Sequence, residues 1–184
     1  MNSGVIASRY AKALLKYVQE VGNGDKVYSQ TCILALRIMN IARLKDYIQK
    51  HDDISVDKKI ELLESCLGEP LAEELKSFLR LVVFRSRMEI FLRMLISFIS
   101  QYRKEKGIKV GRIITAHPAE GLKERLEAVF SEKTGAEVQL VEKVDPAIIG
   151  GFIFELEDYR VDASVEEQLR RIGKGLIVKN NRIV

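Results

Sequence analysis

The chain has 184 residues, of which 47% are hydrophobic and 30% are charged, and it contains only three prolines. This length and composition are typical of a globular protein with one or two modest domains. The net charge of +4 arises from 30 basic and 26 acidic residues that are interspersed, without the clustered basic patch that favours nucleic-acid binding. Polar residues interrupt the segment from Met1 to Leu15, and no apolar run approaches the roughly 20 residues of a membrane span. We therefore expect a cytoplasmic protein without a signal peptide.

Helical periodicity dominates the first half of the chain. Gly22 and Gly24 end the first helix, Ser55 is a candidate N-cap, and Pro70 is expected in the first turn of the fifth helix, where its missing amide costs nothing. The expected helices cover Gly4 to Val21, Val27 to Ile41, Leu44 to Ile48, Val56 to Leu67, Glu69 to Phe84 and Met88 to Lys106. We therefore predict an N-terminal six-helix bundle over residues 1–106.

The second half of the chain mixes strands and helices. Gly107 marks the junction, and the pattern then predicts a strand from Ile108 to Ala116, a helix from Glu120 to Lys133 and a strand from Val138 to Val144. We expect a small C-terminal α/β domain over residues 107–184. The predicted fold class is therefore mainly α with a smaller α+β part.

A glycine pair opens the most informative segment of the chain. Gly150 and Gly151 precede the alternating apolar pattern of a half-buried strand, so we expect them to permit a bulge or close packing. A turn at Glu157 and Asp158 leads to a returning strand that ends at Asp162. No catalytic group stands in this hairpin, which indicates a structural or docking role.

A capped amphipathic helix follows this hairpin. Ser164 and Glu167 have the spacing of a capping box, in which a hydroxyl and a carboxylate satisfy free amides at a helix start. A carboxylate at Asp162, just before the helix, is also favourable there. The helix carries one apolar stripe at spacings of four, three and four residues, namely Val165, Leu169, Ile172 and Leu176. This stripe either receives a partner or is used entirely in the core of the small domain.

The first and fifth helices have wider apolar surfaces than a helix needs to face a core. In the first helix the apolar arc spans about 200°, where a surface helix needs about 100°. One stripe of that arc consists of Ile6, Tyr10, Ala13 and Tyr17. The fifth helix carries Phe78 and Val82 on its main stripe and Leu81 beside it. Two adjacent helices of this kind would form a groove for a third helix, unless both are simply buried in the bundle.

Residues suited to catalysis or metal binding stand apart from one another. His51 lies in a polar segment and His117 precedes a proline, and neither has an identifiable nucleophile or metal partner. No Gly-Lys-Ser/Thr follows the glycine pair, and we expect Asp158 and Asp162 to have structural roles. The sequence therefore predicts no catalytic residue, no metal site and no cofactor.

Two widely separated motifs carry a family resemblance. VDP, then GG with an apolar strand, an acidic turn and VD-x-S-V before a charged helix resemble the C-terminal signature of the delta subunit of F-type ATP synthases. This is the family of the mitochondrial oligomycin-sensitivity-conferring protein. The segment from Ile6 to Leu14 is similar to the family's opening helix with its Tyr-Ala-x-Ala core. The family often has glycine where this chain has Glu157 and Ala163. Because glutamate is strained at positive φ, we expect a longer or different turn here.

The resemblance implies a non-catalytic stator subunit of the proton- or sodium-driven rotary ATP synthase. It would lie on the cytoplasmic face of the cell membrane, held there only through the complex. The helical domain would receive the N-terminal helix of an alpha subunit, which implicates Tyr10 and Ala13, with Leu81 and Val82 more loosely placed. The C-terminal domain would bind the end of the b subunit through its helix stripe or the strand surface beside it.

Two other functions remain open from the residues alone. The first is a basic helical module that binds RNA or DNA through arginine and lysine, whose affinity would fall steeply with salt, unlike that of an apolar groove. The second is an enzyme whose site is assembled from residues far apart in the sequence.

Overall fold

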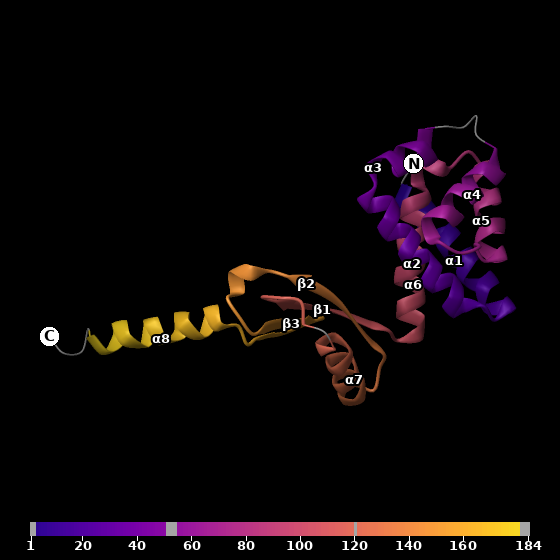
Figure 1. The fold of residues 1–184 in the computed structure, drawn as a ribbon. Coiled ribbons are helices and arrows are strands. Elements are labelled where there is room, and N and C mark those ends of the chain that lie inside the picture. The colour runs from indigo at the N-terminus through magenta and orange to yellow at the C-terminus, as the bar shows by residue number, and fades with distance from the viewer. Residues whose placement is uncertain (1–2, 51–54, 120, 181–184) are drawn as a thin grey trace. The chain divides into compact units, whose positions relative to one another are not determined.

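The computed structural model of the chain describes residues 3–50, 55–119 and 121–180. His51, which the sequence analysis considered, lies outside these ranges. The chain divides into two compact units, residues 1–105 and 106–184, close to the boundary expected at residue 106. The described residues are mostly helical, and a small four-stranded sheet lies in the second unit (Figure 1).

Helices make up the described part of the first unit. They are α1 (Ser3–Val21), α2 (Gly24–Asn40), α3 (Ala42–Lys50), α4 (Val56–Leu67), α5 (Glu73–Phe84) and α6 (Phe91–Lys106), with a 3₁₀ turn, η1 (Met88–Ile90), before α6. Both α1 and α4 contact α2 and α5. The helix that the sequence predicts from Met88 thus begins as a 3₁₀ turn. Met94, Leu95 and Phe98 of α6 are 0% exposed, as its apolar character on most sides leads us to expect.

The start of α5 differs from the prediction. The helix begins at Glu73 rather than at Pro70, because the preceding chain bonds to another helix. The amide of Ala72 donates to Oε1 of Gln30 at 2.8 Å, and Nε2 of Gln30 donates to the carbonyl of Pro70 at 2.9 Å. Gln30 is only 1% exposed, so these bonds are shielded from water. A side chain some 40 positions away therefore keeps this segment extended, and no local pattern predicts that contact.

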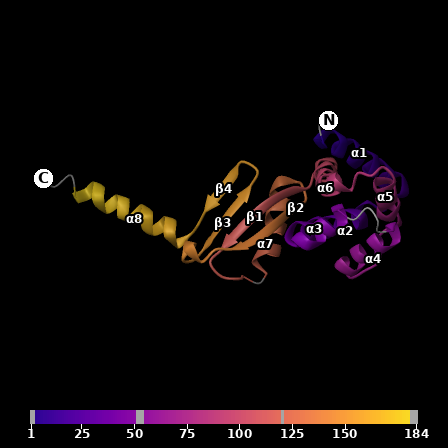
Figure 2. The same ribbon diagram turned by 90° about the horizontal axis from the view of Figure 1, so that it is seen from above.

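A mixed sheet forms the centre of the second unit, with the strand order β2-β1-β3-β4 (Figure 2). β1 (Lys109–Thr115) pairs in parallel with β2 (Val138–Val144) and antiparallel with β3 (Phe152–Leu156). β3 pairs antiparallel with β4 (Tyr159–Asp162). α7 (Leu122–Thr134) is the crossover that a parallel pair requires. A 3₁₀ turn, η2 (Pro146–Ile148), precedes β3, and α8 (Val165–Asn180) follows β4.

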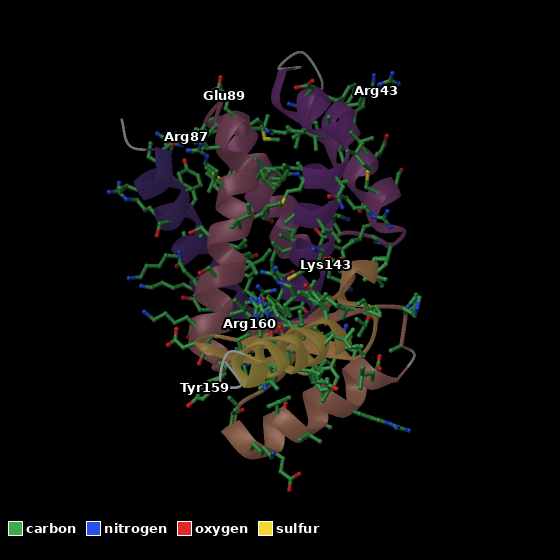
Figure 3. All side chains as sticks on the ribbon, turned by 90° about the vertical axis from the view of Figure 1, so that its left-hand side faces the viewer. Arg43, Arg87, Glu89, Lys143, Tyr159 and Arg160 are labelled. Carbon is green, nitrogen blue, oxygen red and sulfur yellow. The ribbon has the colours of Figure 1, made fainter. Side chains whose placement is uncertain are left out.

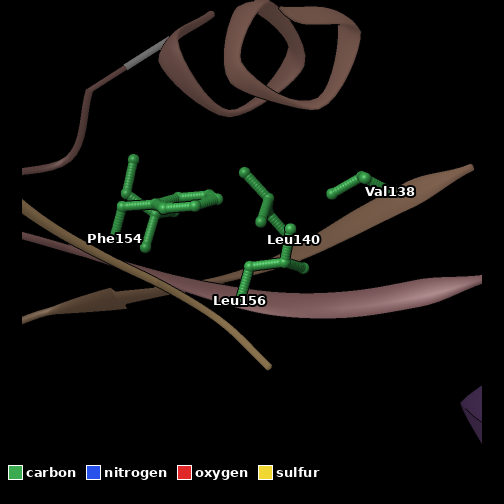
Figure 4. Packing of buried hydrophobic residues seen from close by; sticks show 5 residues of the cluster. Val138, Leu140, Phe154 and Leu156 are labelled. Atoms are coloured by element: carbon green, nitrogen blue, oxygen red, sulfur yellow. The ribbon is translucent and has the colours of Figure 1, made fainter. Parts of the chain in front are cut away.

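The core of the second unit lies between α7 and one face of the sheet. Phe130 of α7 stacks on Phe154 of β3, with their ring centroids 3.9 Å apart. The buried residues beneath α7 are Ile113, Val138, Leu140, Phe154 and Leu156 (Figure 4). Burial of such side chains is worth about 1.5–3 kcal/mol each, so this cluster holds α7 on the sheet.

Of the longer or different turn that the sequence predicts, the β3–β4 hairpin contradicts the longer one. Leu156 pairs with Tyr159, so only Glu157 and Asp158 connect the two strands. Glu157 adopts the left-handed φ of 51°, which is costly for a residue with a Cβ atom. Strand pairing on both sides of the turn supports this conformation. The Glu157 carboxylate also forms an ion pair with Nζ of Lys109, at 3.0 Å.

None of the helices within the described ranges combines the length and the apolar character needed to cross a membrane.

Candidate partner-binding surfaces

The two apolar stripes of α1 have different environments. The inner stripe is buried in the first unit and consists of Ala7, Ala11, Leu14, Leu15 and Val18. On the outer stripe, Ile6 and Tyr10 are partly buried, whereas Ala13 is exposed and Tyr17 is 43% exposed. Part of the wide apolar surface of α1 therefore remains exposed outside the core.

α5 likewise has one buried apolar face and one exposed apolar face. Leu75, Leu79 and Val82 are buried, whereas Leu81 and Phe84 are 44% and 79% exposed. The resemblance places Val82 on a partner surface, but the structure buries it completely, at 0% exposure. Val82 therefore packs inside the helical unit in this structure, and its assignment to a partner surface stays a prediction. Phe84 was not singled out from the sequence, although it lies three residues after Leu81 on a neighbouring face of the helix.

A shallow apolar groove separates the outer faces of α1 and α5. Its volume is about 180 Å³, and its lining consists of Ala13, Leu14, Tyr17, Ser77, Phe78 and Leu81. Phe78 is only 6% exposed, so it forms the floor rather than the rim. Its ring meets that of Tyr10 edge to face, with centroids 6.4 Å apart. The structure thus brings together four of the predicted residues, Ala13, Tyr17, Phe78 and Leu81, and places Tyr10 next to them.

The two helices run antiparallel along this groove. Nδ2 of Asn23, just after α1, donates to Glu74 in the first turn of α5 at 3.2 Å. Beyond the other end of α5, Nη1 of Arg87 donates to Oη of Tyr10 at 3.3 Å, and Figure 3 shows Arg87 beside α1. The groove therefore has a carboxylate bonded to an amide at one end and a guanidinium near the other.

Successive hydrogen bonds through the side chains of Ser164 and Asp162 cap the start of α8. Oγ of Ser164 accepts a hydrogen bond from the amide of Glu167 at 3.2 Å, which is the hydroxyl half of a capping box. The carboxylate half differs from the prediction, because Glu167 forms ion pairs with Arg170 and Arg171. The carboxylate of Asp162 instead accepts the hydrogen bond from the Ser164 amide, and it also accepts one from the Ser164 hydroxyl. These bonds hold the pKa of Asp162 below its ordinary value.

The glycine pair lies against the same connection. Gly151 adopts a φ of 74°, and its Cα side faces the backbone of Ala163 and Ser164. The carbonyl of Gly150 accepts a hydrogen bond from the amide of Val165 at 3.0 Å. Both glycines therefore permit a close approach between the segment before β3 and the segment before α8.

The stripe on α8 is exposed where the structure describes it. Leu169 and Ile172 are 55% and 60% exposed, and Val165 is partly buried. The side chain of Leu176 lies outside the described part of the chain. Because Leu169 and Ile172 remain open to solvent, the interpretation that the small domain uses the whole stripe in its own core is wrong.

The sheet face opposite α7 offers a second exposed surface in this unit. A depression of about 540 Å³ lies there, lined by Val110, Gly111, Arg112, Val141, Glu155 and Glu157. Val141 is 58% exposed. Glu155 forms ion pairs with Nε of Arg112 at 3.5 Å and with Nη1 of Arg160 at 3.1 Å; Arg160 is labelled in Figure 3. The surface combines apolar side chains with charges that are already paired.

Potential metal-binding side chains do not cluster within residues 3–50, 55–119 and 121–180. These ranges hold no cluster of three or more His, Cys, Asp or Glu side chains arranged to bind a metal ion. His117 is exposed at the end of β1.

Comparison with known proteins identifies the family of the chain. Residues 6–176 match the family described as ATP synthase delta (OSCP) subunit. The chain belongs to this family. "ATP synthase subunit delta" of Phocaeicola vulgatus is 42% identical over 186 residues and is matched over 100% of both chains. The protein of the same name from Bacteroides fragilis is 36% identical over 190 residues, again over 100% of both.

A solved structure shares the fold of this family member. A chain in the cryo-EM structure of the Toxoplasma gondii mitochondrial ATP synthase hexamer is similar with a TM-score of 0.61, over 93% of this chain and 97% of that chain, at 19% identity. As a delta-family member the chain is a structural, non-catalytic subunit of ATP synthase. The comparisons lend no support to the nucleic-acid-binding alternative.

Proposed function

We propose that this delta-family subunit links the catalytic head of the ATP synthase to the peripheral stalk. Rotation of the central stalk does work on the head only if the head is held still. A linker with one firm contact on the head and one on the stalk completes the stator that provides this restraint. In this proposal the protein acts on the cytoplasmic face of the cell membrane and reaches the membrane only through the complex.

The first contact uses the helical unit. Its six helices form a bundle, and the groove between α1 and α5 receives the N-terminal helix of an alpha subunit. The single observation that carries this proposal is the row of apolar side chains left exposed on both sides of the groove, Ala13, Tyr17 and Leu81. An amphipathic helix that covers such a groove removes apolar surface from water on both partners.

The second contact uses residues 106–184 and the C-terminal end of the b subunit. Two surfaces are available, the exposed α8 stripe with Leu169 and the open sheet face with Val141. Leu169→Asp and Val141→Asp should be compared for binding of a peptide from the end of the b subunit. The variant that loses binding identifies the surface, and retention of binding by both excludes these two surfaces.

Charge substitutions in the groove test the first contact. Ala13→Asp should abolish binding of the alpha-subunit peptide, because binding would bury an unpaired carboxylate in an apolar groove. Ser8→Asp is the matched control, since Ser8 is exposed about 140° around α1 from Ala13. It should leave binding unchanged. Binding is measured by calorimetry and helicity by circular dichroism. Unchanged binding by folded Ala13→Asp protein would exclude the groove.

Reconstitution tests the linking role itself. Removing the protein should uncouple ATP synthesis from the ion gradient while hydrolysis by the head continues. A chain cut at Gly107 should bind the head through one piece and the stalk through the other, and neither piece alone should restore coupling. Restoration by one piece would contradict a mechanical link, because load must pass through a continuous chain.

A further inference from the structure

We infer that Arg87 determines the direction in which a partner helix lies in the α1–α5 groove, by forming an ion pair with a carboxylate of that helix. This inference rests on the proposed function of the groove. An amphipathic stripe presents apolar side chains at a regular spacing in both directions along its helix. The apolar lining of the groove therefore discriminates weakly between the two orientations. A charge fixed at one end of the groove discriminates between them.

Arg87 is such a fixed charge. Its guanidinium carbon lies 5.4 Å from the ring centroid of Tyr10, and its Nη1 donates to the hydroxyl of the same residue at 3.3 Å. Tyr10 in turn packs its ring against Phe78, on the floor of the groove. The cation is therefore connected to the groove by a chain of two aromatic side chains. Its rotamer freedom is already restricted before any partner binds, which lowers the entropic cost of a further contact.

The backbone before Arg87 is also tightly held. The amide of Ser86 donates to the carbonyl of Val83 at 2.8 Å, and the amide of Arg87 donates to the carbonyl of Val82 at 3.1 Å. These two bonds form a Schellman motif at the end of α5. Ser86 occupies the left-handed position of the motif, with a φ of 50°, where glycine is usual. The motif fixes the backbone of Arg87, whose guanidinium contacts Tyr10.

Arg87 has no partner of opposite charge among the described residues. No carboxylate of the described residues lies within 4.0 Å of its side-chain nitrogens, and the residue is half-buried. A guanidinium has five N–H donors, and Tyr10 accepts one of them. A planar cation with unused donors beside an apolar groove is suited to a carboxylate, which it can bind with two parallel hydrogen bonds.

The opposite end of the groove carries the opposite charge. Glu74 lies there, is 5% exposed and is bonded to Asn23, and Glu20 is exposed in the last turn of α1, three residues before Asn23. A partner helix with its carboxylate near Arg87 is attracted, whereas the reversed helix places that carboxylate near Glu20 and Glu74 and is repelled. The occupant is therefore an amphipathic helix with an apolar stripe and an acidic residue toward one end of that stripe.

Calorimetry on the full-length protein tests this assignment. The probe is a synthetic peptide of about 20 residues, about 30 Å of helix, from the N-terminus of the alpha subunit encoded with this chain. Arg87→Gln should weaken binding about tenfold, the lower range for a charge-assisted hydrogen bond. Arg85→Gln is the matched control, because Arg85 is exposed and lies over the ring of Phe84. It should change the affinity less than about twofold.

Peptide variants test the same contact on the unaltered protein. Each acidic residue of the peptide is replaced in turn by its amide. One replacement should weaken binding as much as Arg87→Gln does, and the two changes together should cost no more than either alone. Arg87→Glu combined with a lysine at that peptide position should restore affinity. The identity of the position then gives the direction of the helix.

The outcomes separate the two proposals. Arg87→Gln binding within about twofold of the parent, or coupling to none of the peptide carboxylates, overturns the role of Arg87 and leaves the groove intact. Failure of the unaltered protein to bind the unaltered peptide overturns the groove itself.

Discussion

A Cβ atom on Gly151 would lie 2.2 Å from the carbonyl oxygen of Ala163. The two residues flank the β3–β4 hairpin, and the amide of Ala163 donates to the carbonyl of Phe152 at 2.9 Å. The close approach therefore forms where the hairpin closes and α8 begins. It joins the sheet to the helix that the proposed function assigns to the stalk contact.

Gly151→Ala should destabilise the second unit by at least about 2 kcal/mol. The left-handed φ alone costs an L-residue about 1 kcal/mol, and the backbone contact cannot relax by a side-chain rotation. Gly173→Ala is the matched control, since a Cβ on Gly173 would meet no atom within 4 Å. It should stabilise α8 by about 0.5–1 kcal/mol. Urea unfolding measures both, and equal stability of the two variants would contradict the packing described for Gly151.

Ser164→Ala should lower the local stability of α8 by about 1 kcal/mol, the usual worth of an N-cap. The substitution removes the acceptor for the Glu167 amide and the hydroxyl donor to Asp162. Hydrogen exchange should show faster exchange at the start of α8, with no change in binding of the alpha-subunit peptide. Ser65→Ala is the control, because Ser65 donates to the carbonyl of Glu61 within its own helix. Unchanged protection of α8 would exclude Ser164 as its cap.

Asp162 should make the second unit sensitive to acid. Its pKa in the folded protein is lowered, first by the hydroxyl of Ser164 and then by the amide of that residue. The stabilisation is therefore fully present above the unfolded pKa of about 3.9 and is lost as pH falls through the lower folded value. The difference in unfolding free energy between the parent and Asp162→Asn, measured from pH 6 to pH 2, should shift in favour of Asp162→Asn as the pH falls. A difference that is constant with pH would exclude this role.

Lys59→Met should stabilise the helical unit by about 1 kcal/mol or more. Lys59 in α4 is 1% exposed, and its Nζ has no hydrogen-bond partner within the described ranges. A buried ammonium without partners is costly, and methionine fills a similar volume without a charge. Lys58→Met, at the exposed neighbouring position, should change stability by less than about 0.5 kcal/mol. Loss of stability in Lys59→Met would show that the charge has a partner in the folded protein.

Local patterns predicted the elements whose signals are contained in neighbouring residues. The hydroxyl of Ser55 accepts from the amide of Lys58 at 3.5 Å, and Gly68 ends α4 with a φ of 82°, as the sequence indicates. These features depend on residues within one helical turn, so the local sequence pattern is sufficient to predict them. The start of α5 was missed because Gln30 holds the chain before it, and that contact crosses the unit.

Local patterns also predicted only part of the candidate binding site. Periodicity placed Ala13 and Tyr17 on a surplus stripe of α1, and both are exposed beside the groove. It could not decide between Leu81 and Val82, which are adjacent in sequence but 44% and 0% exposed. Arg87 was not identified at all, because its relation to Tyr10 spans 77 positions.

The sequence by itself determined the family, the division into a helical and a mixed unit, and the apolar surplus of α1 and α5, since motifs and periodicity are properties of consecutive residues. Only the tertiary structure decided where α5 begins, that Glu157 accepts a left-handed φ, that Asp162 rather than Glu167 supports Ser164, and where Arg87 lies. Each of these depends on the free energy of contacts between distant segments. Such contacts outweigh local propensities of about 1 kcal/mol or less per residue.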